Sequence, residues 1–200
     1  MARRVQTMQP IDKPWEQLNK ASVEINKMKG SKSLDEYEEH WKDYLHNLER
    51  AWNKLTSHLK KSPKFQGWNR RGQIERLRKQ DNLLSYLVNA RGADEHSIED
   101  ITAKESGGIG INPAEGNSLT LTNLKIDGGN ISFESDQAVR IDFIPGKIRL
   151  LPVTNRGRNY KVPSQHLGKA LTSSDPVELS ELAVVFYTEY FREAESYFVK

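Results

Sequence analysis

Residues 33–59 read SLDEYEEHWKDYLHNLERAWNKLTSHL, and this stretch decides the fold of the N-terminal half. Its large apolar side chains recur every three or four positions, as they do on one face of an α-helix. These residues are Tyr37, Trp41, Tyr44, Leu45, Leu48, Trp52, Leu55 and Leu59. We therefore predict a long amphipathic helix, which ends before Ser62-Pro63 because proline cannot continue the hydrogen-bond ladder.

The start of this helix carries a capping box, Ser33-Leu34-Asp35-Glu36. In such a box the side chain of Ser33 accepts a hydrogen bond from the Glu36 amide, and the Glu36 carboxylate reaches back to the Ser33 amide. A second start of this kind, Asp175-Pro176-Val177-Glu178, precedes an apolar stripe near the C-terminus. The sequence thus predicts a second amphipathic helix at that end of the chain.

Two further helices are predicted around residues 33–59. The first runs from Asp12-Lys13-Pro14 to Gly30, with proline tolerated in its first turn. The second follows a loop marked by Gly67 and Gly72, and we expect it to run to about Lys104. Because the loop before it is short, we predict an antiparallel hairpin in which the stripe of residues 33–59 faces Leu77, Leu84 and Leu87.

The pattern of hydrophobicity changes from a helical period to alternation after Ser118. Alternating apolar residues predict half-buried antiparallel strands, with turns at Asp127-Gly128-Gly129-Asn130 and Pro145-Gly146. A further strand, Lys147 to Val153, leads into the basic turn Asn155-Arg156-Gly157-Arg158. We expect one face of these strands to pack against the C-terminal helix, because only alternate residues are apolar.

The predicted class is therefore α+β. An N-terminal antiparallel bundle of three long helices occupies residues 1–105, and residues 106–117 form a glycine-rich linker. Residues 118–200 form a small antiparallel β-sheet closed by a C-terminal helix.

Composition restricts the possible functions. The 200 residues contain no cysteine, which excludes disulfides, thiolate zinc sites and cysteine nucleophiles. No stretch approaches the roughly 20 consecutive apolar residues of a membrane span, and no secretory signal is recognisable, so we expect a cytoplasmic protein without a membrane partner. No phosphate loop, cofactor motif or metal-ligand spacing is present, and we predict neither a cofactor nor a metal.

Positive charge is concentrated in one stretch, although the net charge is only +3. Between residues 60 and 79 eight basic residues stand against a single acid, Glu75. Such a cluster is typical either of a phosphate-facing surface or of the solvated ends of two helices. The candidate RNA-binding residues here are Lys60, Lys61, Lys64, Arg70, Arg71, Arg76 and Arg78, with Trp68 as an exposed aromatic for base stacking.

The sharpest motif is Asn89-Ala90-Arg91-Gly92-Ala93-Asp94-Glu95-His96, in which an arginine and a histidine are five positions apart late in a predicted helix. A histidine can move a proton from a ribose 2′-hydroxyl, and an arginine can stabilise the charge of a phosphorane. A structural alternative is a solvated helix end in which Arg91 pairs with Asp94 or Glu95.

This motif in a helical hairpin resembles the HEPN superfamily, over roughly residues 12–104. The resemblance implies a metal-independent RNA-cleaving site formed by Arg91 and His96, completed across a homodimer, in toxin–antitoxin or antiviral defence systems. Tyr86, Asn89, Asp94 and Glu95 would supply supporting polar groups. The residue after the arginine is often Asn, Asp or His in that family, and here it is Gly92.

Two functions therefore remain open from the sequence. The first is a HEPN-like RNA-binding protein that acts as an endoribonuclease. The second is a non-catalytic regulatory subunit of a bacterial defence system, which holds a protein partner through its β-rich half; Gly92 favours this alternative. Of the remaining histidines, His40, His46 and His58 are interpreted as surface residues, and His166 is expected to pack within a loop.

Overall fold

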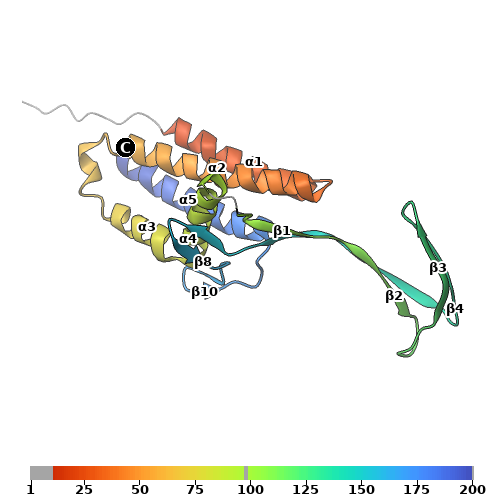
Figure 1. Cartoon of the computed structure of the whole chain (residues 1–200). Coiled ribbons are helices and arrows are strands. Elements are labelled where there is room, and N and C mark those ends of the chain that lie inside the picture. Colours follow the sequence, from red (N-terminus) through yellow and green to blue (C-terminus); the bar gives the residue numbers. More distant parts are fainter. Residues whose placement is uncertain (1–10, 97–98, 200) are drawn as a thin grey trace, which may run out of the picture. The chain divides into compact units, whose positions relative to one another are not determined.

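The computed structural model describes residues 11–96 and 99–199, and the predicted α+β class is confirmed (Figure 1). The helices are α1 (Asp12–Gly30), α2 (Leu34–Leu59), the short 3₁₀ helix η1 (Pro63–Phe65), α3 (Asn69–Gln80), α4 (Asn82–His96) and α5 (Pro176–Phe198). The strands are β1 (Thr102–Glu105), β2 (Gly108–Pro113), β3 (Leu121–Asp127), β4 (Asn130–Ser135), β5 (Val139–Ile144), β6 (Lys147–Leu150), β7 (Val153–Asn155), β8 (Arg158–Tyr160), β9 (Gln165–His166) and β10 (Lys169–Ala170).

The chain forms two compact units, whose boundaries differ from the expected ones. Unit 1 is made of two chain segments, the residues up to Ala103 and those from Ile148 onward. It contains the described helices and strands β7 to β10, and unit 2 spans Lys104–Lys147. The segment expected to be a linker contains β2, which pairs antiparallel with β5. Its glycines do not prevent a strand, because cross-strand hydrogen bonds use only the backbone.

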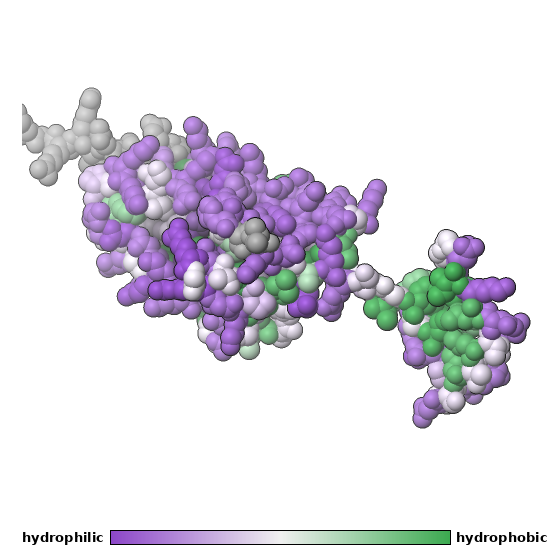
Figure 2. Space-filling model, viewed as in Figure 1, coloured by the Kyte–Doolittle hydropathy of each residue, from purple (hydrophilic) through white to green (hydrophobic). Residues whose placement is uncertain are grey.

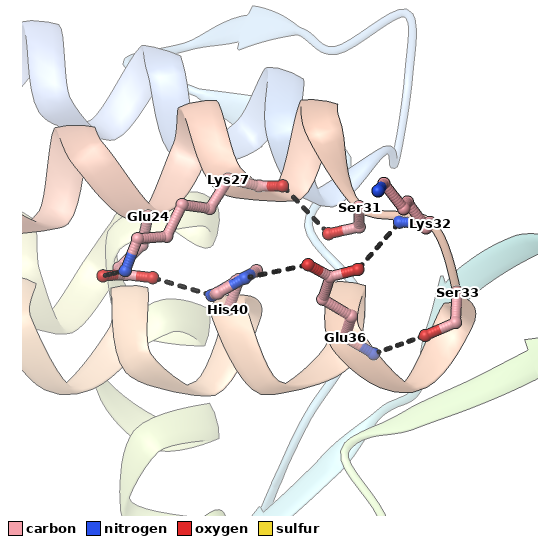
Figure 3. A network of polar contacts seen from close by, with 7 residues as sticks. All are labelled: Glu24, Lys27, Ser31, Lys32, Ser33, Glu36 and His40. Carbon is pink, nitrogen blue, oxygen red and sulfur yellow. Dashed lines mark hydrogen bonds and ion pairs between the residues drawn. The ribbon is translucent and has the colours of Figure 1, made fainter.

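The local start signals are confirmed by the structure. The side chain of Ser33 accepts a hydrogen bond from the Glu36 amide at 3.1 Å, and the side chain of Asp175 accepts from the amides of Val177 and Glu178. One detail of the capping box differs, because the Glu36 carboxylate accepts from the Lys32 amide instead of the Ser33 amide (Figure 3).

The third predicted helix is wrong in its length and continuity. The backbone of Asp81 is extended and separates α3 from α4, and the Asp81 carboxylate accepts a hydrogen bond from the Leu84 amide at 3.0 Å. Asp81 thus caps the start of a new helix. The predicted continuation passes through residues 97–98, outside the described residues, and residues 102–105 form strand β1.

The C-terminal helix α5 packs on the other helices, whereas we expected it to close the β-sheet. It lies along α1, and it also contacts α2 and α4 (Figure 1). Trp15 meets Phe191 with ring centroids 5.2 Å apart, and Trp52 stacks on Tyr190 at 5.7 Å. The apolar stripe of a helix is buried equally well by other helices, so the periodicity of α5 does not choose between these partners.

The four strand pairs whose registers are resolved are all antiparallel, as predicted. In unit 1, β7 pairs with β8, and β9 pairs with β10. In unit 2, β3 pairs with β4, and β2 pairs with β5. In residues 11–96 and 99–199 we find no helix with the length and apolar character that crossing a bilayer requires.

Candidate functional site

A pocket of about 610 Å³ lies in unit 1, where α4 and the end of α3 meet the hairpin of β7 and β8. Its lining contains five permanently charged cations and a single carboxylate, that of Glu49. We call it the basic pocket and define it by Arg78, Lys79, Arg91, His96, Arg156 and Arg158. The two members of the predicted catalytic pair, Arg91 and His96, therefore line the same cavity.

The β7–β8 hairpin supplies two of these cations through a tight turn. Arg156 and Gly157 both have positive φ, +51° and +72°, as a two-residue turn between right-twisted strands requires. Asn155 pairs with Arg158 in the register, so the turn presents Arg156 and Arg158 close together. Both side chains are exposed, and neither forms an ion pair within the described part of the chain.

A close contact holds this hairpin against α4. The Nδ2 atom of Asn155 donates a hydrogen bond to Oδ1 of Asn89 at 3.0 Å. The side-chain Nδ2 of Asn89 in turn donates to the backbone carbonyl of Ser85. A Cβ atom on Gly92 would overlap the Asn155 amide, with Cγ only 3.1 Å away. Gly92 therefore has a packing role, since it lets the strand approach the helix.

The carboxylate of Glu95 lies at the centre of the predicted catalytic pair. It forms an ion pair with Arg91 one helical turn earlier, and it lies 3.8 Å from Nε2 of His96. On its other side, His46 of α2 approaches it at 3.6 Å. The His96 side chain is 72% exposed and that of Arg91 is 28% exposed, so both are open to solvent. Nε of Arg91 is buried without a hydrogen-bond partner.

The supporting residues predicted around the motif have different environments. Asn89 lines the basic pocket, and Asp94 lies 3.6 Å from the ammonium of Lys42. Tyr86 is buried, contrary to its predicted role at the site, and its hydroxyl donates to the Leu151 carbonyl at 2.8 Å. This bond holds the segment that joins β6 to β7, and burial raises the pKa of Tyr86 above its usual range.

The basic stretch of residues 60–79 does not act as one surface. Lys60, Lys61, Lys64 and Arg76 are exposed, but none of them lines the basic pocket. Arg70 is held by Glu193, with 2.6 Å between Nε and Oε2, and this hydrogen bond raises the pKa of Arg70. Arg71 lies over the ring of Phe65 at 5.3 Å. The helices thus use part of this charge for their own ion pairs.

Arg78 is buried, contrary to the prediction of an exposed RNA-binding residue. Its guanidinium donates to the hydroxyl of Tyr187 and to Glu49 at 2.6 Å, and it lies 4.3 Å from the ring centroid of Trp52. Burial alone would lower the pKa of Arg78, but Tyr187 and Glu49 outweigh it and raise the pKa. A buried cation needs such partners, and they hold Arg78 in the lining of the basic pocket.

Trp68 is also buried, at 6% exposure, which excludes the predicted base-stacking role in this conformation. Its ring stacks on Tyr190 at 5.3 Å and on Tyr197 at 6.0 Å, and the edge of Phe198 meets it at 5.1 Å. The aromatic residues of α5 therefore occupy the face that would have met a base.

His166 is buried in a hydrogen-bonded pair, which agrees with the packing role expected of it, although it lies in strand β9 and not in a loop. Its Nδ1 lies 2.9 Å from the Asp81 carboxylate, which also accepts from the Leu167 amide at 2.6 Å. Burial alone would raise the pKa of Asp81, but hydrogen bonds from His166, Leu84 and Leu167 outweigh it and lower the pKa. This pair attaches the β9–β10 turn to the start of α4.

Glu24, His40 and Asp43 bring three potential metal-ligand atoms within 4.8 Å of one another. Nδ1 of His40 lies 2.9 Å from the Glu24 carboxylate, which also pairs with the ammonium of Lys27 at 2.9 Å (Figure 3). Because two cationic or hydrogen-bonding groups already engage Glu24, we assign this group a structural role between α1 and α2. None of these three residues lines the basic pocket.

Lys79, Asn155, Arg156 and Arg158 also line the pocket, and His46 is a neighbour of Glu95, although none of these roles was predicted from the sequence. The basic turn at residues 155–158 was recognisable as a tight pair of arginines. Its position beside α4 was not, because that contact joins segments more than 60 residues apart.

Comparisons with protein-family models, with curated proteins and with solved structures give no match for this chain. The resemblance to the HEPN superfamily therefore depends on Arg91, His96 and their helical setting, and it stays a prediction.

Proposed function

We propose that the protein binds RNA in the basic pocket and cleaves it without a metal, as a HEPN-like endoribonuclease. The observation that supports this proposal is that Arg91 and His96 line one solvent-open pocket together with Arg156 and Arg158. The proposed setting is a cytoplasmic toxin–antitoxin or antiviral defence system, as the resemblance implies.

Binding would use the unpaired cations. Guanidinium groups bind phosphate oxygens through two parallel hydrogen bonds, and Arg156 and Arg158 are exposed and form no ion pair with any described residue. Among the described residues that line the pocket, Glu49 is the single carboxylate, and it is already paired with Arg78. A phosphodiester would therefore enter a pocket with an excess of positive charge.

Cleavage would use the chemistry of a vicinal hydroxyl. His96 takes the proton of the ribose 2′-hydroxyl, the 2′-oxygen forms a bond to phosphorus, and the bond from phosphorus to the 5′-oxygen breaks. The leaving 5′-oxygen takes a proton from an imidazolium or from water, which gives a 2′,3′-cyclic phosphate and a 5′-hydroxyl. Arg91 stabilises the negative charge that grows on the phosphorane oxygens.

The non-catalytic alternative is favoured by one observation. Arg91 already forms an ion pair with Glu95 at i+4, which is the structural arrangement that the sequence left open. For catalysis the phosphate must compete with Glu95 for this guanidinium. If it cannot, the pocket would still bind RNA, and the chain would serve as a regulatory subunit.

The test incubates purified full-length protein with total RNA in EDTA and compares Arg91→Ala, His96→Ala and the double variant with Arg192→Ala. Arg192 is a matched control because it is an exposed arginine of α5 that does not line the basic pocket and is not a candidate RNA-binding residue. We expect cleavage by the wild type and the control, with cyclic-phosphate ends, and a loss of 100-fold or more in each site variant, on the order expected for acid–base and charge-stabilising groups.

Equal cleavage by the wild type and the double variant would refute the catalytic proposal. Binding is measured separately with Arg156→Ala/Arg158→Ala, which should weaken RNA affinity and reduce the dependence of affinity on salt. Unchanged affinity in that variant would refute the RNA-binding proposal.

A further inference from the structure

Unit 2 has no core of its own. None of the residues from Lys104 to Lys147, all of which the structure describes, is buried. The unit consists mainly of two ribbons, β2–β5 and β3–β4, and each of them has only two strands. An isolated two-stranded ribbon is at best marginally stable in water, so unit 2 requires cover from elsewhere.

The ribbon of β2 and β5 has one entirely apolar face. Residues that are cross-strand partners lie on the same face, and residues two apart along a strand share it. The register places three apolar pairs on this face: Ile109 with Phe143, Ile111 with Ile141, and Pro113 with Val139. The opposite face is polar at its centre, where Asn112 donates to Asp142 at 2.8 Å and Arg140 pairs with the same carboxylate.

The ribbon of β3 and β4 repeats this arrangement with the help of a bulge. The register shifts between Thr122 and Lys125, and Asn123 adopts a positive φ of +54°. The extra residue brings Leu121 and Leu124, three positions apart, to the same face. This face carries Leu121, Leu124, Ile126, Ile131 and Phe133. Neither apolar face contains a charged side chain.

These faces are open to solvent. Phe143 is 81% exposed, Ile126 is 72% exposed, and Ile141 and Leu124 are each 51% exposed. Figure 2 shows hydrophobic residues gathered over the surface of unit 2. Together with Ile109 they expose on the order of 500 Å² of apolar side chain, as much as the largest patch on a typical monomer.

We propose that unit 2 is a homodimerisation element, in which the apolar ribbon faces of two copies pack together. The uncharged faces require an apolar partner surface of similar extent, and a second copy presents one. A two-fold axis would cover both copies at once, because each patch meets its own equivalent. Two patches would bury about 1,000 Å², the minimum expected of a specific interface, before any rim contacts are added.

This inference concerns surfaces outside the basic pocket and does not depend on RNA binding or cleavage. The first test is sedimentation of the full-length protein at micromolar concentration. We expect a dimer for the wild type and a monomer for Ile141→Asp/Phe143→Asp. The control is Val185→Asp, which changes a 58% exposed apolar residue of α5 in unit 1 and should leave the dimer intact. A monomeric wild type, or a dimer that persists in the double variant, would overturn the proposal.

A second test does not depend on disruptive charges. The chain has no cysteine, so Ile141→Cys and Arg140→Cys each introduce a single thiol, on the apolar and the polar face of the same strand. A thiol-to-thiol reagent with a spacer of about 10 Å, the separation of packed sheets, should link two copies of Ile141→Cys much faster than two copies of Arg140→Cys. Equal rates for the two variants would contradict the proposed face.

Discussion

Gly92 and Asn155 are so close that a single added carbon on Gly92 would overlap the Asn155 side chain. Asn155 in turn donates to Asn89, one turn earlier on the same helix. The position that departs from the HEPN pattern is therefore the position where strand β7 meets α4. The contact with Asn155 explains why this residue is a glycine. The glycine therefore does not bear on whether Arg91 and His96 are catalytic.

The first prediction tests this contact. Gly92→Ala should lower the free energy of unfolding by about 1 kcal/mol, because the overlap with Asn155 outweighs the higher helix propensity of alanine. In an Asn155→Ala background the same change should raise it by up to about 1 kcal/mol. Denaturant unfolding of the four proteins in this cycle gives both values.

The control for that cycle is Gly72→Ala. Gly72 also lies within a helix, α3, and an added Cβ meets nothing within 4 Å. This substitution should stabilise the protein by about 0.5–1 kcal/mol. A gain of the same size at Gly92 in the wild-type background would show that Asn155 moves aside at no cost.

The second prediction concerns Trp68, which the sequence suggested as a base-stacking residue. Since it is 6% exposed and packed among three aromatic rings, Trp68→Ala should cost about 3–5 kcal/mol of stability. Trp68→Phe should remain folded and bind RNA like the wild type. A tenfold weaker affinity in folded Trp68→Phe would restore the original interpretation.

The third prediction separates Arg78 from the other arginines of the pocket. Arg78→Ala should cost about 3–5 kcal/mol, because it leaves the Glu49 carboxylate without its partner. Arg156→Ala should change stability by about 0.5 kcal/mol or less, because its side chain is exposed and forms no ion pair with a described residue. Thermal unfolding of the two variants side by side measures the difference, and similar losses would show that the hairpin arginine is also structural.

The fourth prediction is a pH dependence that arises from Asp81. Its pKa in the folded protein lies below the ordinary value of 3.8, so its carboxylate favours the fold above that value. This contribution is complete above about pH 5 and is lost as the pH falls through the lowered pKa.

Asp81→Ala should therefore destabilise the protein by about 2–3 kcal/mol at neutral pH, through the lost cap of α4 and the lost partner of His166. The difference in stability between the variant and the wild type should shrink as the pH falls below about 4, because protonation of Asp81 then removes the ionised carboxylate from the wild type as well. Chemical unfolding at a series of pH values measures it, and a difference that stays constant into strong acid would exclude the ionised carboxylate as its source.

The helix starts and the apolar stripes followed from the sequence alone. Ser33 and Asp175 cap helices through bonds that span two or three residues, and these local bonds need no other part of the chain. Most of the stripe of residues 33–59 is buried, and its remaining members, Tyr37 and Trp52, pack partly buried against the core, since the period leaves one orientation that hides the apolar face.

Contacts between distant segments of the chain determined the helix break at Asp81, the strand at residues 108–113 and the basic pocket. Asp81 breaks a continuous helical pattern because His166 and Leu167, more than 80 residues later, hold its carboxylate. The glycine-rich segment 108–113 is a strand because residues 139–144 pair with it. The basic pocket exists only because the turn at Arg156 meets α4 at Gly92. Periodicity specifies which face of an element is apolar, but shape and hydrogen bonding between remote segments specify what covers that face.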